Sequence, residues 1–169
     1  MKKQIEAVEK FHNAFEQDNG TYPRPLTKDE YDLRYKLMAE ENYEYLEGCE
    51  SNSLIEIADA LGDQLYILCG TILRHGMQHI IEDVFDEIQA SNMSKLGEDG
   101  KPVLRDDLKI LKGPNYFKPD LTKFIKADVA AEKVSRMLGY KSCGCAERQQ
   151  ALNKPELLVN KVFYNNDKK

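Results

Sequence analysis

The fold of this chain is constrained most by a segment that is apolar over nearly its whole length, residues 54–75. Ser53 and Glu56 have the spacing of a capping box that opens a helix, and Gly76 is a typical residue after a helix end. The apolar positions cover most of the helix circumference: Leu54, Ile55, Ile57, Ala58, Leu61, Leu65, Ile67, Leu68, Ile72 and Leu73. A helix that is apolar nearly all round is normally buried, so this segment predicts a central helix in a helical protein.

The exceptions on this helix are acidic and lie on one stripe. With about 100° of rotation per residue, Glu56, Asp59 and Asp63 lie within about 60° of one another. Neighbouring carboxylates are costly to bury unless a cation neutralises them. Alternatively, the three acids have only a structural role and bind no cation. We consider this the weaker interpretation, because the rest of the helix is so apolar.

A second acidic set precedes the first. Thr27 and Glu30 form another capping box, and a helix over about 28–47 carries Glu40, Glu41, Glu44 and Glu47. Taken alone, these residues are typical of a solvated helix face. If the two helices are antiparallel about a turn near Glu50, however, Glu44 faces Glu56 and Glu41 faces Asp59. Four converging carboxylates with no Lys or Arg on their stripe suit Mg²⁺ or Mn²⁺.

The remaining pattern predicts an all-α protein with a four-helix-bundle-like core. A first amphipathic helix begins near Ile5 and stops near residues 18–20, and an extended connector follows. Further helices are expected at 78–90 and 121–138, with a short basic tail helix at 146–153. Residues 91–119 lack a helical period and form a long irregular loop with hairpin character near Asp99 and Gly100. We expect one domain over 1–125, with 126–169 packed on it or on a partner subunit.

Composition narrows the function. The 169-residue chain carries 24 Lys and Arg against 29 Asp and Glu, a net charge of −5, which argues against binding to a nucleic-acid polymer. No apolar run is long enough to span a membrane, and the N-terminus lacks the apolar region of a signal peptide. The four cysteines form no visible disulfide framework, and Cys143 and Cys145 are a single pair where a structural zinc site uses two. We therefore expect a cytoplasmic protein without a membrane partner.

Together these residues resemble a known family. Glu41-x-x-Glu44 followed by Glu56-x-x-Asp59, in the segments MAEENYEYLEG and SLIEIADALGDQLYIL, looks like the ExxE…ExxD signature of the all-α nucleoside triphosphate pyrophosphohydrolases. That superfamily includes MazG, the dimeric dUTPases, the dCTPases and phosphoribosyl-ATP pyrophosphohydrolase. The similarity covers about residues 1–125 and is closest to a MazG-like subgroup, which shares blocks resembling SNMSKL, EDGKP and KGPNY. The gap between Glu44 and Glu56 is shorter than in many relatives, so Glu40 or Asp63 could replace one of the four ligands.

The resemblance implies Mg²⁺-dependent hydrolysis of a (deoxy)nucleoside triphosphate, such as dUTP, dCTP or a non-canonical nucleotide, to the monophosphate and pyrophosphate. Glu41, Glu44, Glu56 and Asp59 would hold the metal ions, with Glu40 and Asp63 as further candidates. A carboxylate of the Glu40, Glu41 and Glu44 set would orient or deprotonate the attacking water. The loop offers Asn92, Lys95 and Lys112 for the phosphates, although any such lysine can equally be an ordinary surface charge.

A homodimer, or a dimer of dimers, is also expected, because one short bundle leaves its apolar faces incompletely covered and the resemblance implies pairing into a four-helix core. Two other functions stay open. One is hydrolysis of phosphoribosyl-ATP, for which the long loop is not expected, and the other is a non-catalytic nucleotide-binding helical module.

Overall fold

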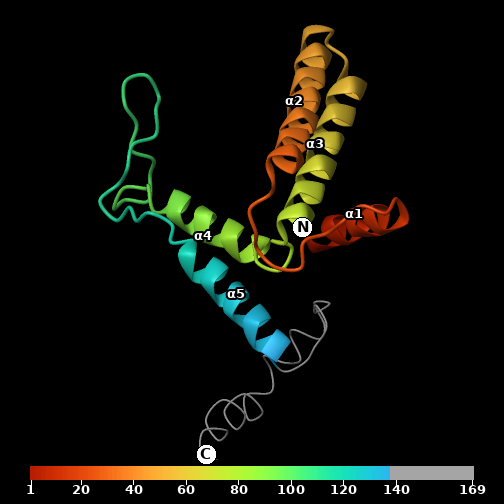
Figure 1. The fold of residues 1–169 in the computed structure, drawn as a ribbon. Helices are drawn as coiled ribbons and strands as arrows, with labels where there is room; N and C mark the ends of the chain where they lie inside the picture. The colour runs from red at the N-terminus through yellow and green to blue at the C-terminus, as the bar shows by residue number, and fades with distance from the viewer. Residues whose placement is uncertain (138–169) are drawn as a thin grey trace, which may run out of the picture.

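The computed structural model describes residues 1–137, and their regular structure consists of five helices (Figure 1). These are α1 (Lys2–Ala14), α2 (Lys28–Glu50), α3 (Leu54–His75), α4 (Ile81–Met93) and α5 (Thr122–Met137). The all-α prediction is confirmed, and α3 has the predicted bounds. Other bounds differ. Helix α1 ends at Ala14, before the predicted stop near residues 18–20, and α2 continues beyond residue 47. Helix α4 begins after residue 78 and extends beyond residue 90. The predicted helix at 146–153 and the Cys143–Cys145 pair lie outside the described residues.

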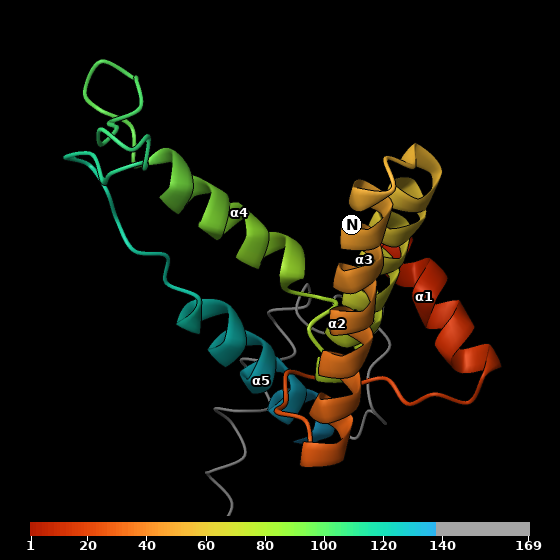
Figure 2. The same cartoon turned by 90° about the horizontal axis from the view of Figure 1, so that it is seen from above.

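Helices α2 and α3 form an antiparallel hairpin, which stands out in both views (Figures 1 and 2). Both helices begin at the predicted caps. The backbone N–H of Thr27 donates to Glu30 Oε2 over 2.9 Å, and Ser53 Oγ accepts from the backbone N–H of Glu56 over 3.3 Å. These bonds satisfy N–H groups that a helix start leaves without intrahelical partners.

The core lies where α1 packs against the C-terminal half of α3. It consists of Ile5, Val8, Cys69, Ile72 and Leu73, with Met77 and Ile81 packed at its edge. The connector between α1 and α2 closes this end, because the backbone N–H of Gly20 donates to Leu73 O over 2.7 Å.

Gly76 makes that closure feasible. It ends α3 in the left-handed conformation, with φ of 71°. A Cβ atom at this position would lie only 2.1 Å from the carbonyl oxygen of Tyr22. Glycine therefore meets both a conformational and a steric requirement here.

The prediction that α3 is buried along its whole length is wrong for its N-terminal half. Leu54 and Ile55 are 81% and 83% exposed, and Leu61 is 50% exposed. Within residues 1–137, α1 covers only the C-terminal half, and α2 covers only one side. Hydrophobic periodicity predicts that a face needs a partner, but it does not say that the partner belongs to the same chain.

Helix α4 leads away from the base of the hairpin, and the loop after it lies at the far end of this arm (Figures 1 and 2). Helix α5 returns from the loop. Its start is held by Glu87 of α4, which accepts from Asp120 N over 3.0 Å and from Lys123 Nζ over 2.8 Å. The α-ammonium group of Met1 pairs with Glu82 over 2.9 Å and so ties α4 to α1.

The loop has the predicted hairpin character. Two isolated antiparallel bridges join Leu96 to Pro102 and Leu104 to Ile110. None of the helices within residues 1–137 has the length and apolarity needed to cross a membrane.

Candidate active site

Five carboxylates lie on one side of the α2–α3 hairpin. Glu41 is at their centre, and its pKa is raised first by burial and then by the negative charges of Glu44, Asp63, Glu40 and Asp59. The Oε2 atom of Glu41 is buried and has no hydrogen-bond partner among the described residues. In residues 1–137 no Lys, Arg or His forms an ion pair with any of the five. A group of like charges around an unsatisfied oxygen is the environment that a cation would relieve.

The register of the hairpin differs from the prediction. Gln64 Nε2 on α3 donates to the backbone carbonyl of Glu41 over 3.2 Å, so Gln64 rather than Asp59 lies opposite Glu41. The shift is about one helical turn. The predicted turn centre near Glu50 was too early, because α2 ends at Glu50 and α3 begins at Leu54. Asp63, expected as an alternative ligand, consequently acts on Glu41 more strongly than Asp59 does.

Glu56 occupies a different place from the other acids. Its Oε2 accepts from Ser51 Oγ over 2.8 Å, close to the turn of the hairpin. The shifted register carries Glu44 away from Glu56, so the predicted opposition of these two residues is not found. Glu56 lies nearer the hairpin tip than the group around Glu41.

The five carboxylates have the right chemistry for a divalent-metal site, but their side chains are not arranged as a complete set of ligands. All five supply oxygen donors, the kind that Mg²⁺ and Mn²⁺ prefer, and the orphaned Glu41 Oε2 is an atom that a metal ion would satisfy. Within residues 1–137, however, no three His, Cys, Asp or Glu side chains converge closely enough to form a ready ligand set. The residue types therefore suit Mg²⁺ or Mn²⁺. To coordinate the ion together, side chains of α2 and α3 would have to rotate.

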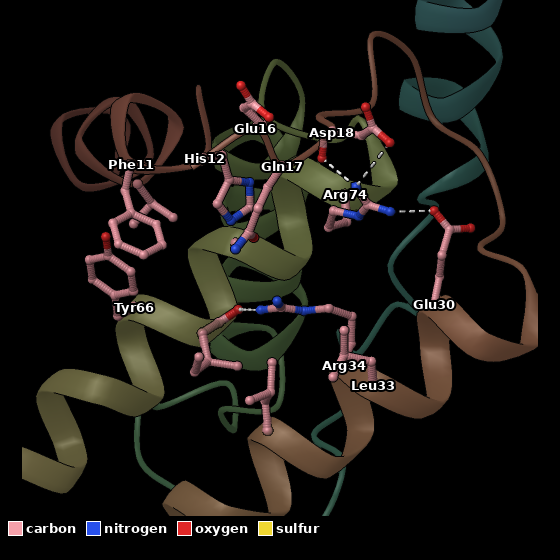
Figure 3. A pocket seen from close by; sticks show the side chains of 14 residues that line it. Phe11, His12, Glu16, Gln17, Asp18, Glu30, Leu33, Arg34, Tyr66 and Arg74 are labelled. Atoms are coloured by element: carbon pink, nitrogen blue, oxygen red, sulfur yellow. Dashed lines mark hydrogen bonds and ion pairs between the residues drawn. The ribbon is translucent and has the colours of Figure 1, made fainter. Parts of the chain in front are cut away.

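A pocket of about 490 Å³ is lined by residues of α1, the segment after α1, α2 and α3, next to the place where α1 packs on α3 (Figure 3). Its floor includes Arg34, which is seven residues before Glu41 on α2. Seven residues are close to two turns, so both side chains share a face and are about 10 Å apart along the helix. The rim is aromatic, since Phe11 packs edge-to-face on Tyr66 with ring centroids 5.7 Å apart.

Arg34 is a buried cation without an acidic partner in the described part of the chain. It is 9% exposed, and its Nε and Nη2 donate to Thr71 Oγ1 over 2.9 Å and to Ile67 O over 2.7 Å. Burial and the charge of Arg74 both lower the pKa of Arg34. A guanidinium whose partners are all neutral keeps its positive charge available to an anionic or carbonyl-bearing ligand.

His12 lies across the pocket from Arg34 (Figure 3). The imidazole is 3% exposed, and its Nδ1 is 2.6 Å from Asn19 Oδ1, so Nδ1 carries a proton in this arrangement. Gly70 leaves room for both groups. A Cβ atom there would lie 3.0 Å from Arg34 Nη2 and 3.1 Å from His12 Nε2.

Arg74 also lines the pocket, but its positive charge is already balanced by an acidic partner. It pairs with Glu30 over 2.5 Å and donates to Asp18 O over 2.6 Å. Glu30 also binds Arg24 over 3.0 Å, and hydrogen bonds from Arg24 and Thr27 hold the pKa of Glu30 far below its ordinary value. These interactions hold the segment between α1 and α2 against the hairpin and order one wall of the pocket.

The three residues predicted to bind phosphate gather at the far end of α4. Lys95 Nζ donates to Asn92 Oδ1 over 2.7 Å, and the backbone N–H of Gly113 donates to Lys95 O over 3.0 Å. The ammonium group of the adjacent Lys112 lies 4.3 Å from the ring centroid of Tyr116. The end of α4 and the loop after it, which carry these three residues, lie away from the α2–α3 hairpin in both views (Figures 1 and 2).

The sequence reasoning missed the pocket. One signal for it was visible, namely Arg34 spaced seven residues before Glu41 on the same face. A second was Gly70, since a glycine inside an otherwise apolar helix often marks a close approach by another group. The packing of α1 on α3, which brings Val8, Phe11 and His12 to the pocket, is a tertiary feature that neither signal contains.

A helical hairpin with carboxylates on one side is what the resemblance to the all-α NTP pyrophosphohydrolases leads one to expect. Comparison with protein-family models agrees, because the model of phosphoribosyl-ATP pyrophosphohydrolase matches residues 8–92, half of the chain. The chain belongs to this family, within the MazG-like all-α NTP pyrophosphohydrolase superfamily. Membership supports a nucleotide pyrophosphohydrolase activity in the broad sense and leaves the substrate open.

Solved structures include a candidate NTP pyrophosphohydrolase from Exiguobacterium sp. 255-15. It is 23% identical, the match covers 79% of this chain and 97% of that chain, and the TM-score is 0.40. No curated protein matches the chain.

Proposed function

We propose that the protein is a divalent-metal-dependent enzyme that hydrolyses a nucleoside triphosphate to the monophosphate and pyrophosphate. The observation that carries the proposal is the buried, unpartnered Oε2 of Glu41 inside a group of four other carboxylates. A bare acidic group would repel a triphosphate, so a bound cation is needed to reverse the local charge.

Mg²⁺ held by Glu41, Glu44, Asp59 and Asp63 would neutralise charge on the phosphates and on the leaving pyrophosphate. Glu40 and Glu56 remain further candidates for this ligand set. A carboxylate of the Glu40, Glu41 and Glu44 set would orient the attacking water or accept its proton.

The pocket beside the carboxylates supports binding of the nucleoside part. Its aromatic rim offers a surface for a planar base, and Arg34 offers hydrogen-bond donors to carbonyl groups. The distance of about two helical turns between Arg34 and Glu41 is comparable with the length of a nucleoside. A house-cleaning role on dUTP, dCTP or a non-canonical nucleotide is consistent with this arrangement.

The proposal is tested by incubating the protein with a panel of nucleoside triphosphates and Mg²⁺ or Mn²⁺ and measuring monophosphate and pyrophosphate. Glu41→Gln should lower turnover at least a hundredfold. Glu50→Gln, an exposed acid of the same helix, is the matched control and should retain full activity. Absence of pyrophosphate from every nucleotide, or full activity of Glu41→Gln, would refute the proposal.

Phosphoribosyl-ATP is a second candidate substrate, favoured by the family model that matches residues 8–92. Including it in the panel decides between the two. A non-catalytic nucleotide-binding module is a third reading, and calorimetry would identify it by nucleotide affinity without turnover.

Oligomerisation forms part of the proposal. Exposed apolar residues recur on the hairpin side away from the carboxylates, at Leu54, Leu61, Leu65 and Leu68 of α3. Their spacing of seven, four and three residues places them on one face. We infer that a second copy covers this face, which gives the expected homodimer a specific interface.

A further inference from the structure

The aromatic rim of the pocket cannot by itself distinguish one base from another. Phe11 and Tyr66 are exposed there, and every nucleobase has a flat face that can stack on such a ring. Discrimination requires hydrogen-bonding groups that meet the edge of the base. The pocket contains two buried groups of this kind, the guanidinium of Arg34 and the imidazole of His12 (Figure 3).

Arg34 presents only donors to the pocket. An arginine side chain has five N–H bonds and no acceptor. Nε and Nη2 each use one of these bonds, on Thr71 Oγ1 and Ile67 O, and no described residue accepts from Nη1. The Thr71 hydroxyl donates its own proton to Ile67 O over 2.9 Å, so toward Arg34 it can only accept. The guanidinium is therefore held in place with N–H groups left for a ligand.

His12 presents an acceptor. Asn19 Nδ2 donates to Asn13 Oδ1 over 3.4 Å, which turns the carbonyl end of the Asn19 amide toward the ring. A carbonyl oxygen can only accept, so the proton of the neutral imidazole lies on Nδ1 and Nε2 carries the lone pair. No residue in the described part of the chain donates to Nε2, which leaves this lone pair for a ligand.

The donor and the acceptor meet at Gly70. The Cβ position of this residue is 3.0 Å from Arg34 Nη2 and 3.1 Å from His12 Nε2, so both nitrogens flank one point where α3 has no side chain. A carbonyl group next to a ring N–H is the complementary pair, an acceptor and a donor on adjacent atoms. Uracil, thymine, guanine and hypoxanthine carry this pair. Cytosine and adenine carry the reverse, an amino group next to a ring nitrogen with a lone pair.

The reversed pattern is mismatched on both atoms. The amino group of cytosine or adenine would direct its N–H bonds at the donors of Arg34, and the ring nitrogen would direct its lone pair at His12 Nε2. Both side chains are buried, so water does not readily replace the lost hydrogen bonds. A buried donor or acceptor left without a partner is much less favourable than the same group in solvent.

We propose that Arg34 and His12 bind the Watson–Crick edge of the base, and that the pocket prefers a base with a carbonyl group next to a ring N–H. Arg34 donates to the carbonyl oxygen, and His12 Nε2 accepts from the ring N–H. The proposal rests on the proposed function and narrows its substrates to triphosphates such as dUTP, dGTP or dITP, with dCTP and dATP as poor substrates.

Two pairs of nucleotides test the preference, because the members of each pair differ only at this edge: dUTP with dCTP, and dITP with dATP. In at least one pair, the wild type should have a kcat/KM at least tenfold higher for the carbonyl-bearing member. The pair that shows the difference also tells whether the pocket takes a pyrimidine or a purine. A ratio of one or less in both pairs would overturn the proposal.

Substitutions assign the preference to the two side chains. Arg34→Met and His12→Phe should each bring the kcat/KM ratio close to one. Arg34→Met leaves no carbonyl unpaired, because Thr71 still donates to Ile67 O. Lys36→Met removes an exposed cation from the same helix and is the matched control, with an unchanged ratio. A wild-type ratio retained in both pocket variants would refute the assignment.

A second measurement requires neither turnover nor metal, and it uses the wild type alone. NMR titration with deoxyuridine, deoxycytidine, deoxyinosine and deoxyadenosine compares the affinities of uncharged ligands. Tighter binding of deoxyuridine than deoxycytidine, or of deoxyinosine than deoxyadenosine, supports the preference even if no triphosphate is hydrolysed, and the proposed reaction alone would then fail. Equal affinities within both pairs, or binding of none of the four, would refute the base preference and leave the proposed reaction standing.

Discussion

The side-chain amide of Gln64 on α3 donates a hydrogen bond of 3.2 Å to the main-chain carbonyl of Glu41 on α2. The same amide group lies 3.3 Å from Asn42 Oδ1. This contact between the helices fixes the register in the middle of the hairpin. Asp63, the neighbour of Gln64, is thereby brought to the side of the hairpin where its charge acts on Glu41.

The raised pKa of Glu41 predicts a pH-dependent gain in stability on removing its charge. A carboxyl whose pKa is higher in the folded chain than in the unfolded chain favours folding at low pH, and this contribution is lost as the pH rises through the folded-state pKa. Glu41→Gln should therefore raise Tm at pH 7 in the presence of a chelator, and the gain should vanish at about pH 3. Thermal unfolding at the two pH values measures it, with Glu50→Gln as a control. A lower Tm for Glu41→Gln at pH 7 would contradict the electrostatic interpretation.

Divalent ions should also raise the Tm of the wild type, because they neutralise the same charges. If Mg²⁺ or Mn²⁺ binds the folded carboxylates, an ion concentration of 100 times Kd adds about 2.7 kcal/mol to the free energy of unfolding. We expect Tm to rise with added Mn²⁺ for the wild type and to stay nearly constant for Glu41→Gln. Removal of the ion with a chelator should return the wild type to its lower Tm. Equal shifts in both proteins would show that Glu41 holds no metal.

Gly70→Ala should weaken nucleotide binding while leaving the helix sound. The added Cβ would press on Arg34 Nη2 and His12 Nε2, which shape the pocket floor. Gly62→Ala is a matched control on the same helix, because no atom lies within 4 Å of the Cβ position there. Both substitutions gain up to about 1 kcal/mol of helix propensity. Only Gly70→Ala should raise KM several-fold. Steady-state kinetics on both variants tests this difference in KM.

Leu65→Glu should separate the two copies. The residue is 41% exposed and lies in the middle of the apolar face of α3. A buried unpaired carboxylate at a dimer interface is strongly unfavourable, whereas on a free surface it costs little. Analytical ultracentrifugation should give a dimer for the wild type and a monomer for the variant. If both sediment as monomers, the apolar face has another occupant.

Gly76→Ala tests the closure between the connector and the hairpin. The left-handed φ of 71° costs an alanine about 1–2 kcal/mol, and the contact with Tyr22 O adds to this penalty. We expect a loss of more than about 2 kcal/mol in the free energy of unfolding, measured by urea denaturation. Gly100→Ala has a similar φ of 74° but open space around it, so it should lose only the conformational part.

Local signals in the sequence were sufficient to predict that the chain is helical and to single out the acidic residues of the candidate site. Ser53 and Gly76 mark the two ends of α3, and the acids were found because they interrupt an apolar pattern. The register was not accessible in this way, since it depends on a contact between Gln64 and the backbone of Glu41 and on the place where the turn falls. Likewise, the burial of Arg34 depends on its contacts with Ile67 and Thr71 of α3, and no pattern within α2 contains that information.

The partial burial of α3 has a consequence for local stability. Its C-terminal half is held in the core by α1, but Leu54 and Ile55 near the hairpin tip are almost fully exposed. Amide hydrogens in the tip should exchange faster with solvent than those around Leu73, since few apolar contacts oppose local opening there. Glu56 and Asp59 lie on that more labile half. Any ligand that joins α2 to α3 there, whether a metal ion or a second chain, would make the hairpin tip as rigid as its base.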